Sequence, residues 1–200
     1  MTEVQYDIRL EDICWTYSGT TSPAIKKINL KVKKGEIIVI TGPSGAGKTT
    51  VCSCFNGLIP HFHRGELTGN IFVKKMNVKK IDTAIMAGFV GFVFDSPANQ
   101  LFCTTVREEI AFGPENYCLP VEEILKRVED AINFSRLNGY EERNPHSLSG
   151  GEQQACAIAA IAAMHPSIFV LDEPTSNLDP YGTEIVFDRI NELVRSEEKT

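Results

Sequence analysis

The sequence predicts an α/β fold, and three observations carry that prediction. An apolar, strand-like run at residues 37–40 leads into a glycine-rich loop and then into a helical pattern. A second apolar run at 168–171 ends in two adjacent carboxylates. Between these strand signals, residues 97–150 change to helical spacing. We therefore expect a three-layer α/β core with an N-terminal antiparallel β subdomain and a helical subdomain at 97–150.

Composition excludes several classes of protein. Two hundred residues, 42% hydrophobic and 23% charged, suit one domain that folds alone. The N-terminus lacks a secretory pattern and no run approaches about 18 uncharged apolar residues, so we expect a cytosolic chain without a membrane span. A net charge of −6 offers no basic face for nucleic acid. The six cysteines lack zinc or redox spacing, and we expect buried free thiols.

The first half of the chain has mainly strand patterns. Residues 4–17 alternate well enough for an antiparallel strand, and 28–32 and 36–41 follow as further strands. A helix at 48–58 should carry the glycine-rich loop. His61 and His63 would point to opposite sides of an extended segment, which favours a plain surface loop over a metal pair. Further strands are predicted at 70–73 and at 89–94, and the segment from residue 84 leads into the second of these.

The second half is mainly helical. Thr105 can cap a helix at 106–112, and Pro120 opens a second helix at 121–137. A last amphipathic helix is expected at about 180–195. Its apolar side should be buried through Ile185, Val186, Ile190 and Leu193.

The glycine-rich loop is the centre of the predicted site. Gly42, Gly47, Lys48 and Thr49 fill every fixed position of the phosphate-binding pattern G-x-x-x-x-G-K-[ST]. Glycines let successive N–H groups point into one concavity, and the next helix directs its positive end there. Lys48 can reach the β- and γ-phosphates, and the Thr49 hydroxyl can bind Mg²⁺. The predicted nucleotide loop is Gly42, Pro43, Ser44, Gly45, Ala46, Gly47, Lys48, Thr49 and Thr50.

Two further groups of residues complete the predicted site. Asp172 ends an apolar strand, where a phosphate-loop ATPase orients Mg²⁺, and Glu173 beside it can polarise the attacking water. Ser149, Gly150 and Gly151 open a helix and form a second anion site of the same design. Because a whole helical subdomain separates this second site from the phosphate loop, we expect it to serve a nucleotide held by another chain.

Together these motifs resemble the ATP-binding cassette ATPases over essentially the whole chain. Tyr17 matches the aromatic residue that stacks on adenine, 148–154 the signature motif, 168–172 the Walker B strand, and 176–179 the D-loop. The resemblance implies a phosphate-loop NTPase core that uses ATP and Mg²⁺ and pairs head to tail with a second cassette chain. It assigns catalysis to Glu173 and Lys48, nucleotide binding to Tyr17, the phosphate loop, Ser149, Gly150, Gly151 and Glu152, and Mg²⁺ to Thr49, Asp95 and Asp172.

Short loops at 56–61, 99–102 and 111–116 resemble the energy-coupling factor branch, whose ATPases drive uptake of vitamins or metal ions. This resemblance implies transmembrane partner subunits, no nucleic acid, and a cytoplasmic location at the inner face of the cell membrane.

Three departures from the family pattern stand out. Asp95 replaces a glutamine that ligates Mg²⁺, and a carboxylate there adds charge near the triphosphate. Ala155 replaces an arginine that usually follows the signature. The family's switch histidine lies beyond the D-loop helix, and the chain reaches Thr200 before it, so we expect one cassette truncated at its C-terminus.

These departures leave two rival functions open. The first is a nucleotide-binding but weakly hydrolysing half of a heterodimeric pair, which Asp95 and Ala155 support and Glu173 opposes. The second is a soluble cassette protein that acts on nucleic acid in DNA repair or translation. The short spacer between the phosphate loop and the signature disfavours that second function, since repair proteins carry a long coiled-coil insertion there.

Overall fold

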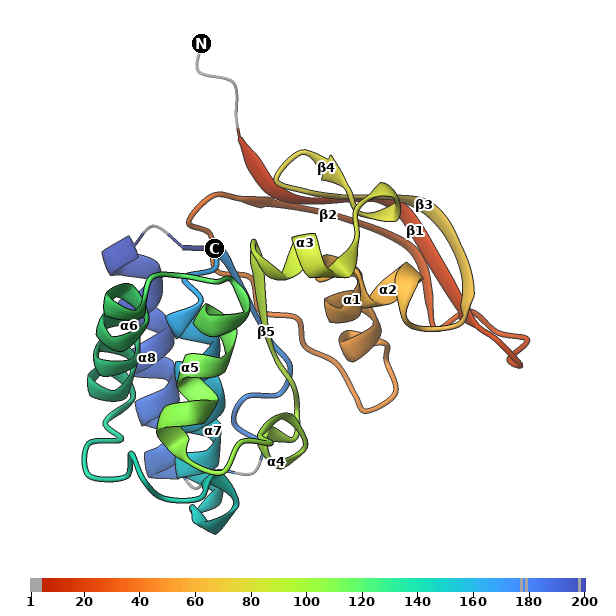
Figure 1. The fold of residues 1–200 in the computed structure, drawn as a ribbon. Coiled ribbons are helices and arrows are strands. Elements are labelled where there is room, and N and C mark those ends of the chain that lie inside the picture. Colours follow the sequence, from red (N-terminus) through yellow and green to blue (C-terminus); the bar gives the residue numbers. More distant parts are fainter. Residues whose placement is uncertain (1–4, 177, 179, 198) are drawn as a thin grey trace. The chain divides into compact units, whose positions relative to one another are not determined.

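The computed structural model describes residues 5–176, 178, 180–197 and 199–200, without the side chains of 181, 182, 185, 189 and 193–197 (Figure 1). The chain divides into two compact units. The first unit contains Met1–Val90, Ser167–Val170 and Val194–Thr200, and the second contains Gly91–Pro166 and Leu171–Leu193.

The first unit is built on an antiparallel sheet with strand order β2-β1-β3-β4 (Figure 1). Alternate residues of the central strand β1 are buried, and Leu10 pairs with Leu30 on one side and Ile71 on the other. The predicted alternation is therefore confirmed over residues 6–17 as a half-buried strand, and residue 4 of the prediction lies outside the described residues. The strands are β1 (Tyr6–Tyr17), β2 (Ile25–Lys33), β3 (Gly65–Val73) and β4 (Met76–Asn77).

Short helices accompany this sheet. The predicted helix at 48–58 is two helices, because Gly57 adopts a φ of 81° and ends the first helical path. Buried side chains of the first helix include Val51, Cys54 and Phe55, which join the apolar core of the unit. The helices are α1 (Lys48–Phe55), α2 (Leu58–His61), the 3₁₀ turn η1 (Val78–Lys80) and α3 (Thr83–Ala87).

Strands β5 (Val90–Val93) and β6 (Ile168–Leu171) form a two-stranded sheet. The Ile168 N–H donates to the Phe89 carbonyl at 3.0 Å, and the Asp172 N–H donates to the Val93 carbonyl at 2.9 Å. Because the residue numbers increase in the same direction along both strands, the strands are parallel. Thr200 also bonds to β6, donating to Ser167 and accepting from Phe169.

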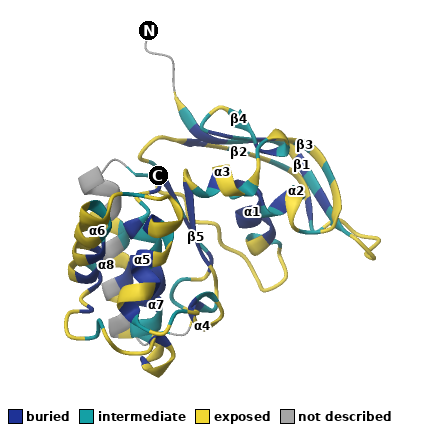
Figure 2. Cartoon of the chain, viewed as in Figure 1, coloured by how far each residue is buried: buried dark blue, intermediate teal, exposed yellow. Residues whose placement is uncertain are grey.

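The second unit is helical. Its core lies between α5, α6 and α7, and Figure 2 shows the buried residues concentrated on α5 and α7. Thr105 caps α5 in a capping box with Glu108, as the sequence predicts for a helix beginning at 106. The elements are α4 (Pro97–Gln100), α5 (Val106–Asn116), α6 (Val121–Ser135), the 3₁₀ turn η2 (Pro145–Ser147), α7 (Gly150–Ala163) and α8 (Pro180–Glu197). Val186 and Ile190 of α8 join this core, whereas the Ile185 and Leu193 side chains lie outside the described residues.

The structure overturns one predicted strand. Residues 36–41 have no regular secondary structure and pair with no strand in the described part of the chain, and Ile37, Ile38, Val39 and Ile40 are exposed. An apolar run supplies burial potential, but a strand also needs a neighbour for its N–H and C=O groups. In contrast, β3 begins at Gly65 rather than at residue 70, because its polar first half pairs with β1.

Two expectations drawn from composition have mixed outcomes. Cys52, Cys54 and Cys156 are buried free thiols, but Cys118 is exposed and Cys14 and Cys103 are half-buried, so the expectation of uniformly buried cysteines is wrong. Burial raises the pKa of the Cys54 and Cys156 thiols to about 12.

Among the described residues, none of the helices has both the length and the apolar composition needed to span a bilayer.

Candidate functional site

The phosphate loop requires glycine at Gly47 for two reasons. Gly47 has a φ of 91°, in the left-handed region that side chains disfavour. A Cβ at this position would lie 2.7 Å from the Ala24 carbonyl oxygen and 2.8 Å from Ile25 Cγ2. The loop can turn into α1 at this point only because there is no side chain.

Lys48 folds back over the loop that precedes it. Its Nζ donates to the carbonyl oxygens of Gly42 at 3.3 Å and Pro43 at 3.4 Å. The Ala46 N–H also donates to the Pro43 carbonyl, at 3.2 Å, which closes a turn in the middle of the loop. Thr49, the next residue, is exposed. The loop therefore holds a cation at its mouth, where phosphate oxygens can replace the carbonyls.

Tyr17 is tied to the helix that follows the phosphate loop. Its hydroxyl lies 3.1 Å from Thr50 Oγ1, and Thr50 is buried. Trp15, which is fully buried, meets the Tyr17 ring edge to face at 5.6 Å between ring centroids. The sequence indicated Tyr17 as an adenine-stacking residue but gave no signal for the hydroxyl link to Thr50.

The carboxylates of the candidate catalytic group follow the carboxyl ends of two paired strands. The Asp172 N–H bonds to Val93, and Asp95 lies two residues beyond Val93. Parallel strands end at the same edge of a sheet, where α/β proteins place their ligands. Asp172 is 3% exposed and Asp95 is exposed, so one carboxylate is enclosed and the other faces solvent.

Glu173 has a strained backbone. Its φ is 48°, a left-handed conformation that costs a non-glycine residue about 1–2 kcal/mol. Its carbonyl accepts the Ser176 N–H at 3.1 Å, which begins the turn toward the D-loop. Strain of this kind is typical of functional positions. Asn177 and Asp179 of the predicted D-loop lie outside the described residues.

Gln100 has a role that the sequence did not reveal. Its Oε1 accepts the Phe94 N–H at 3.1 Å, and its Nε2 donates to the Phe92 carbonyl at 3.2 Å. The side chain thereby continues the hydrogen bonding of β5 and holds the backbone that leads to Asp95. A glutamine seven residues after the end of a strand is too weak a signal to predict this bond.

The signature segment begins α7 with a capping box. The Ser149 N–H donates to Glu152 Oε2 at 2.8 Å, and the Glu152 N–H donates to Ser149 Oγ at 3.4 Å. These bonds to Ser149, together with a hydrogen bond from Tyr140 and the charge of Arg143, lower the pKa of the Glu152 carboxyl. A carboxylate therefore occupies the positive end of α7. Gly150 and Gly151 form the first residues of the same helix.

The predicted site residues are divided between the two units. Tyr17, Thr50 and the phosphate loop belong to the first unit, and Asp95, Asp172, Glu173 and Ser149–Glu152 belong to the second. The described residues contain no cluster of three or more His, Cys, Asp or Glu side chains. Thr49 in the first unit and Asp172 in the second each carry an oxygen donor of the kind that Mg²⁺ takes.

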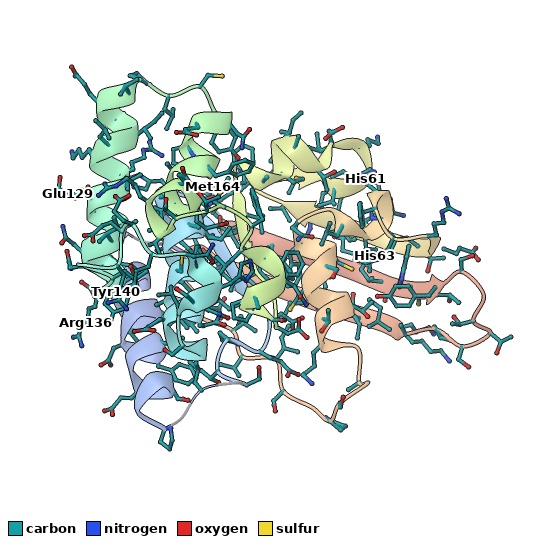
Figure 3. The ribbon with its side chains drawn as sticks, turned by 60° about the horizontal axis from the view of Figure 1, so that its bottom comes forward. His61, His63, Glu129, Arg136, Tyr140 and Met164 are labelled. Atoms are coloured by element: carbon teal, nitrogen blue, oxygen red, sulfur yellow. The ribbon has the colours of Figure 1, made fainter. Side chains whose placement is uncertain are left out.

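His61 and His63 have different surroundings, and His61 is the last residue of α2 rather than part of the predicted extended loop. His61 Nε2 lies 2.7 Å from the Val78 carbonyl oxygen, and the His63 ring instead contacts Tyr17 (Figure 3).

A family model described as ABC transporter matches residues 25–176. The chain belongs to the ABC transporter family. It is 44% identical to a putative ABC transporter ATP-binding protein of Pyrococcus abyssi, covering 96% of this chain and 68% of that protein. It is also 44% identical to one from Caldanaerobacter subterraneus, covering all of this chain and 35% of that protein.

Solved cassettes share the fold, and the predicted fold class is confirmed. The structure of cbiO1 from Clostridium perfringens, part of the ABC transporter complex cbiONQ, is 32% identical with a TM-score of 0.86, covering 98% of this chain and 76% of that one. A dimeric ATP-binding cassette in a post-hydrolysis state with ADP and Pi is 27% identical with a TM-score of 0.83. The likeness covers 96% of this chain and 85% of that one. The chain spans 29% to 35% of the length of the first three curated relatives.

Proposed function

We propose that this chain binds and hydrolyses ATP to drive a membrane importer of the energy-coupling factor type, for a vitamin or a metal ion. The observation that carries the ATP site is the phosphate loop, where Gly47 turns the backbone into α1 and Lys48 covers the loop. Tyr17, bonded to Thr50 in the same unit, supplies a ring for the base. The importer type rests on the short loops noted in the sequence and on the likeness to a member of the cbiONQ complex.

ATP binds through the first unit in this proposal. The base stacks on Tyr17, and Lys48 exchanges its bonds to two loop carbonyls for bonds to the β- and γ-phosphates. Thr49 and Asp172 would hold Mg²⁺, with Asp95 as a further oxygen donor. The ion, when bound, neutralises charge that develops on the phosphates.

Glu173 would act as the general base for hydrolysis. A water oxygen attacks the γ-phosphorus in line, its proton passes to the Glu173 carboxylate, and the bond to the bridging β-γ oxygen breaks to release ADP. The left-handed backbone of Glu173 supports this role, because strained backbone conformations cluster at functional sites.

A second chain would complete the site. Ser149 and the N–H groups of Gly150 and Gly151 would contact the γ-phosphate of the nucleotide on the partner, in a homo- or heterodimer. The dimeric state of a similar solved cassette supports this arrangement. Closure of the pair would move transmembrane subunits, which places the chain at the inner face of the membrane.

A weakly hydrolysing half of a heterodimer is the second candidate. The exposed Asp95 favours it, because a carboxylate beside a triphosphate adds repulsion that an amide would not.

Calorimetric titration with ATP tests the central claim. Lys48→Ala removes the cation at the phosphates, and we expect the Kd for ATP to rise by about 100-fold or more, as two charge-assisted hydrogen bonds are lost. Lys80→Ala removes the same charge from an exposed position of the same unit and should leave the Kd unchanged. Equal affinities of the Lys48 variant and the unaltered protein would refute the ATP site. Co-purification of transmembrane subunits from native membranes tests the importer role.

A further inference from the structure

The loop between α2 and β3 contains two aromatic side chains, Phe62 and His63. His63 is labelled in Figure 3. The His63 ring meets the Tyr17 ring at 6.0 Å between centroids with an interplanar angle of 86°. Phe62 contacts His63 at 5.8 Å and is 76% exposed. His63 is half-buried, so of the two side chains it is the one enclosed against the sheet.

Strand pairing fixes where His63 lies. Tyr17 pairs with Gly65, and the Ser18 N–H donates to the Arg64 carbonyl at 3.0 Å. A Cβ on Gly65 would lie 2.5 Å from Trp15 Cζ2, so the approach of β3 to β1 depends on glycine here. His63 is only two residues before Gly65, and its backbone is therefore held beside Tyr17.

The Tyr17 ring is thus restrained by three different groups. Trp15 contacts it edge to face, Thr50 bonds to its hydroxyl, and His63 contacts it at nearly a right angle. Perpendicular ring contacts are attractive and define the plane of the ring. A ring whose plane is fixed before the ligand arrives loses less conformational freedom when a base stacks on it.

We propose that His63 is a positioning residue of the base site, which sets the Tyr17 ring for stacking of the purine. This inference rests on the proposed ATP-binding function. His61 has no such role, since its ring nitrogen bonds to the Val78 carbonyl.

The test compares ligands with and without a base. In the complete protein, His63→Ala should raise the Kd for ATP and for ADP by about two- to tenfold, the range of one aromatic pair, and leave the Kd for inorganic tripolyphosphate unchanged. The KM for ATP should rise by the same factor at constant kcat. His63→Phe keeps a ring edge and should restore most of the affinity. Phe62→Ala removes an exposed aromatic side chain from the same loop and should bind ATP normally.

A double variant isolates the route of action. Adding His63→Ala to Tyr17→Ala should cause no further loss of ATP affinity, because His63 acts through the Tyr17 ring. An unchanged Kd for ATP in His63→Ala, an equal loss for tripolyphosphate, or failure of His63→Phe to recover affinity would each overturn the role of His63 while the ATP site stands. If the unaltered protein does not bind ATP, the proposed function fails and this inference fails with it.

Discussion

The two units of this chain differ sharply in charge. The first carries 14 basic and 9 acidic residues, and the second carries 6 basic and 17 acidic residues. The net charge of −6 therefore conceals a positive unit that contains the phosphate loop and a negative unit that contains the candidate catalytic carboxylates. A triphosphate is attracted to the first kind of surface, whereas water activation needs the second. The difference suggests that binding and hydrolysis can be separated by mutation.

The largest effect should come from the acidic unit, on turnover alone. Glu173→Gln removes the proposed general base, and we expect kcat to fall by about 100- to 10,000-fold with the Kd for ATP unchanged. Glu129→Gln, an exposed acid of the same unit, is the matched control and should keep full turnover. A large change in the Kd for ATP with Glu173→Gln would contradict the assignment of binding to the first unit and hydrolysis to the second. Sedimentation in ATP should also show a trapped dimer of the Glu173 variant.

The next effect should come from the phosphate loop, on stability. Gly47→Ala adds a side chain at positive φ and against Ala24, and we expect the free energy of unfolding to fall by about 2–4 kcal/mol. Gly19→Ala has a comparable φ of 84° but meets nothing within 4 Å, so it measures the cost of the backbone conformation alone. Chemical denaturation of both variants compares the two costs. Equal losses would show that the contact with Ala24 is unimportant.

A smaller effect should appear at Asp95. Asp95→Gln removes a carboxylate near the proposed triphosphate, and we expect the Mg²⁺-ATP affinity or kcat to rise by about two- to fivefold. The measurement is steady-state hydrolysis over a range of Mg²⁺ concentrations. A fall in activity would instead mean that the aspartate has its own role. It would also weaken the case for a weakly hydrolysing half of a heterodimer.

The smallest effect should be a pH dependence at the start of α7. The pKa of Glu152 is lowered from its ordinary 4.5, chiefly by the bonds to Ser149, so its carboxylate stabilises the folded state at pH values above 4.5. That stabilisation is lost as the pH falls through the lowered pKa. Glu152→Gln should therefore be slightly less stable than the unaltered protein at pH 7 and equal to it at strongly acidic pH. A difference in melting temperature that is the same at both pH values would contradict this explanation.

Local patterns predicted the elements whose signals are contiguous in sequence. The cap at Thr105, the alternation of β1 and the start of a helix at Lys48 all depend on residues a few positions apart, and each is found where it was predicted. The prediction of a strand at 36–41 was wrong, because an apolar pattern indicates burial but does not supply a hydrogen-bonding neighbour. The subdomain boundaries at 97–150 and the roles of the site residues remain predictions.

The sequence by itself determined the family, the fold class and the identity of the loop that would bind phosphate, because these depend on fixed spacing between residue types. Only the tertiary structure decided that Thr50 holds Tyr17, that Gln100 continues β5, and that His63 lies against the Tyr17 ring. Each of these contacts joins residues that strand register or a helix brings together. Register follows from the hydrogen bonding of whole strands, which no short run of residues contains.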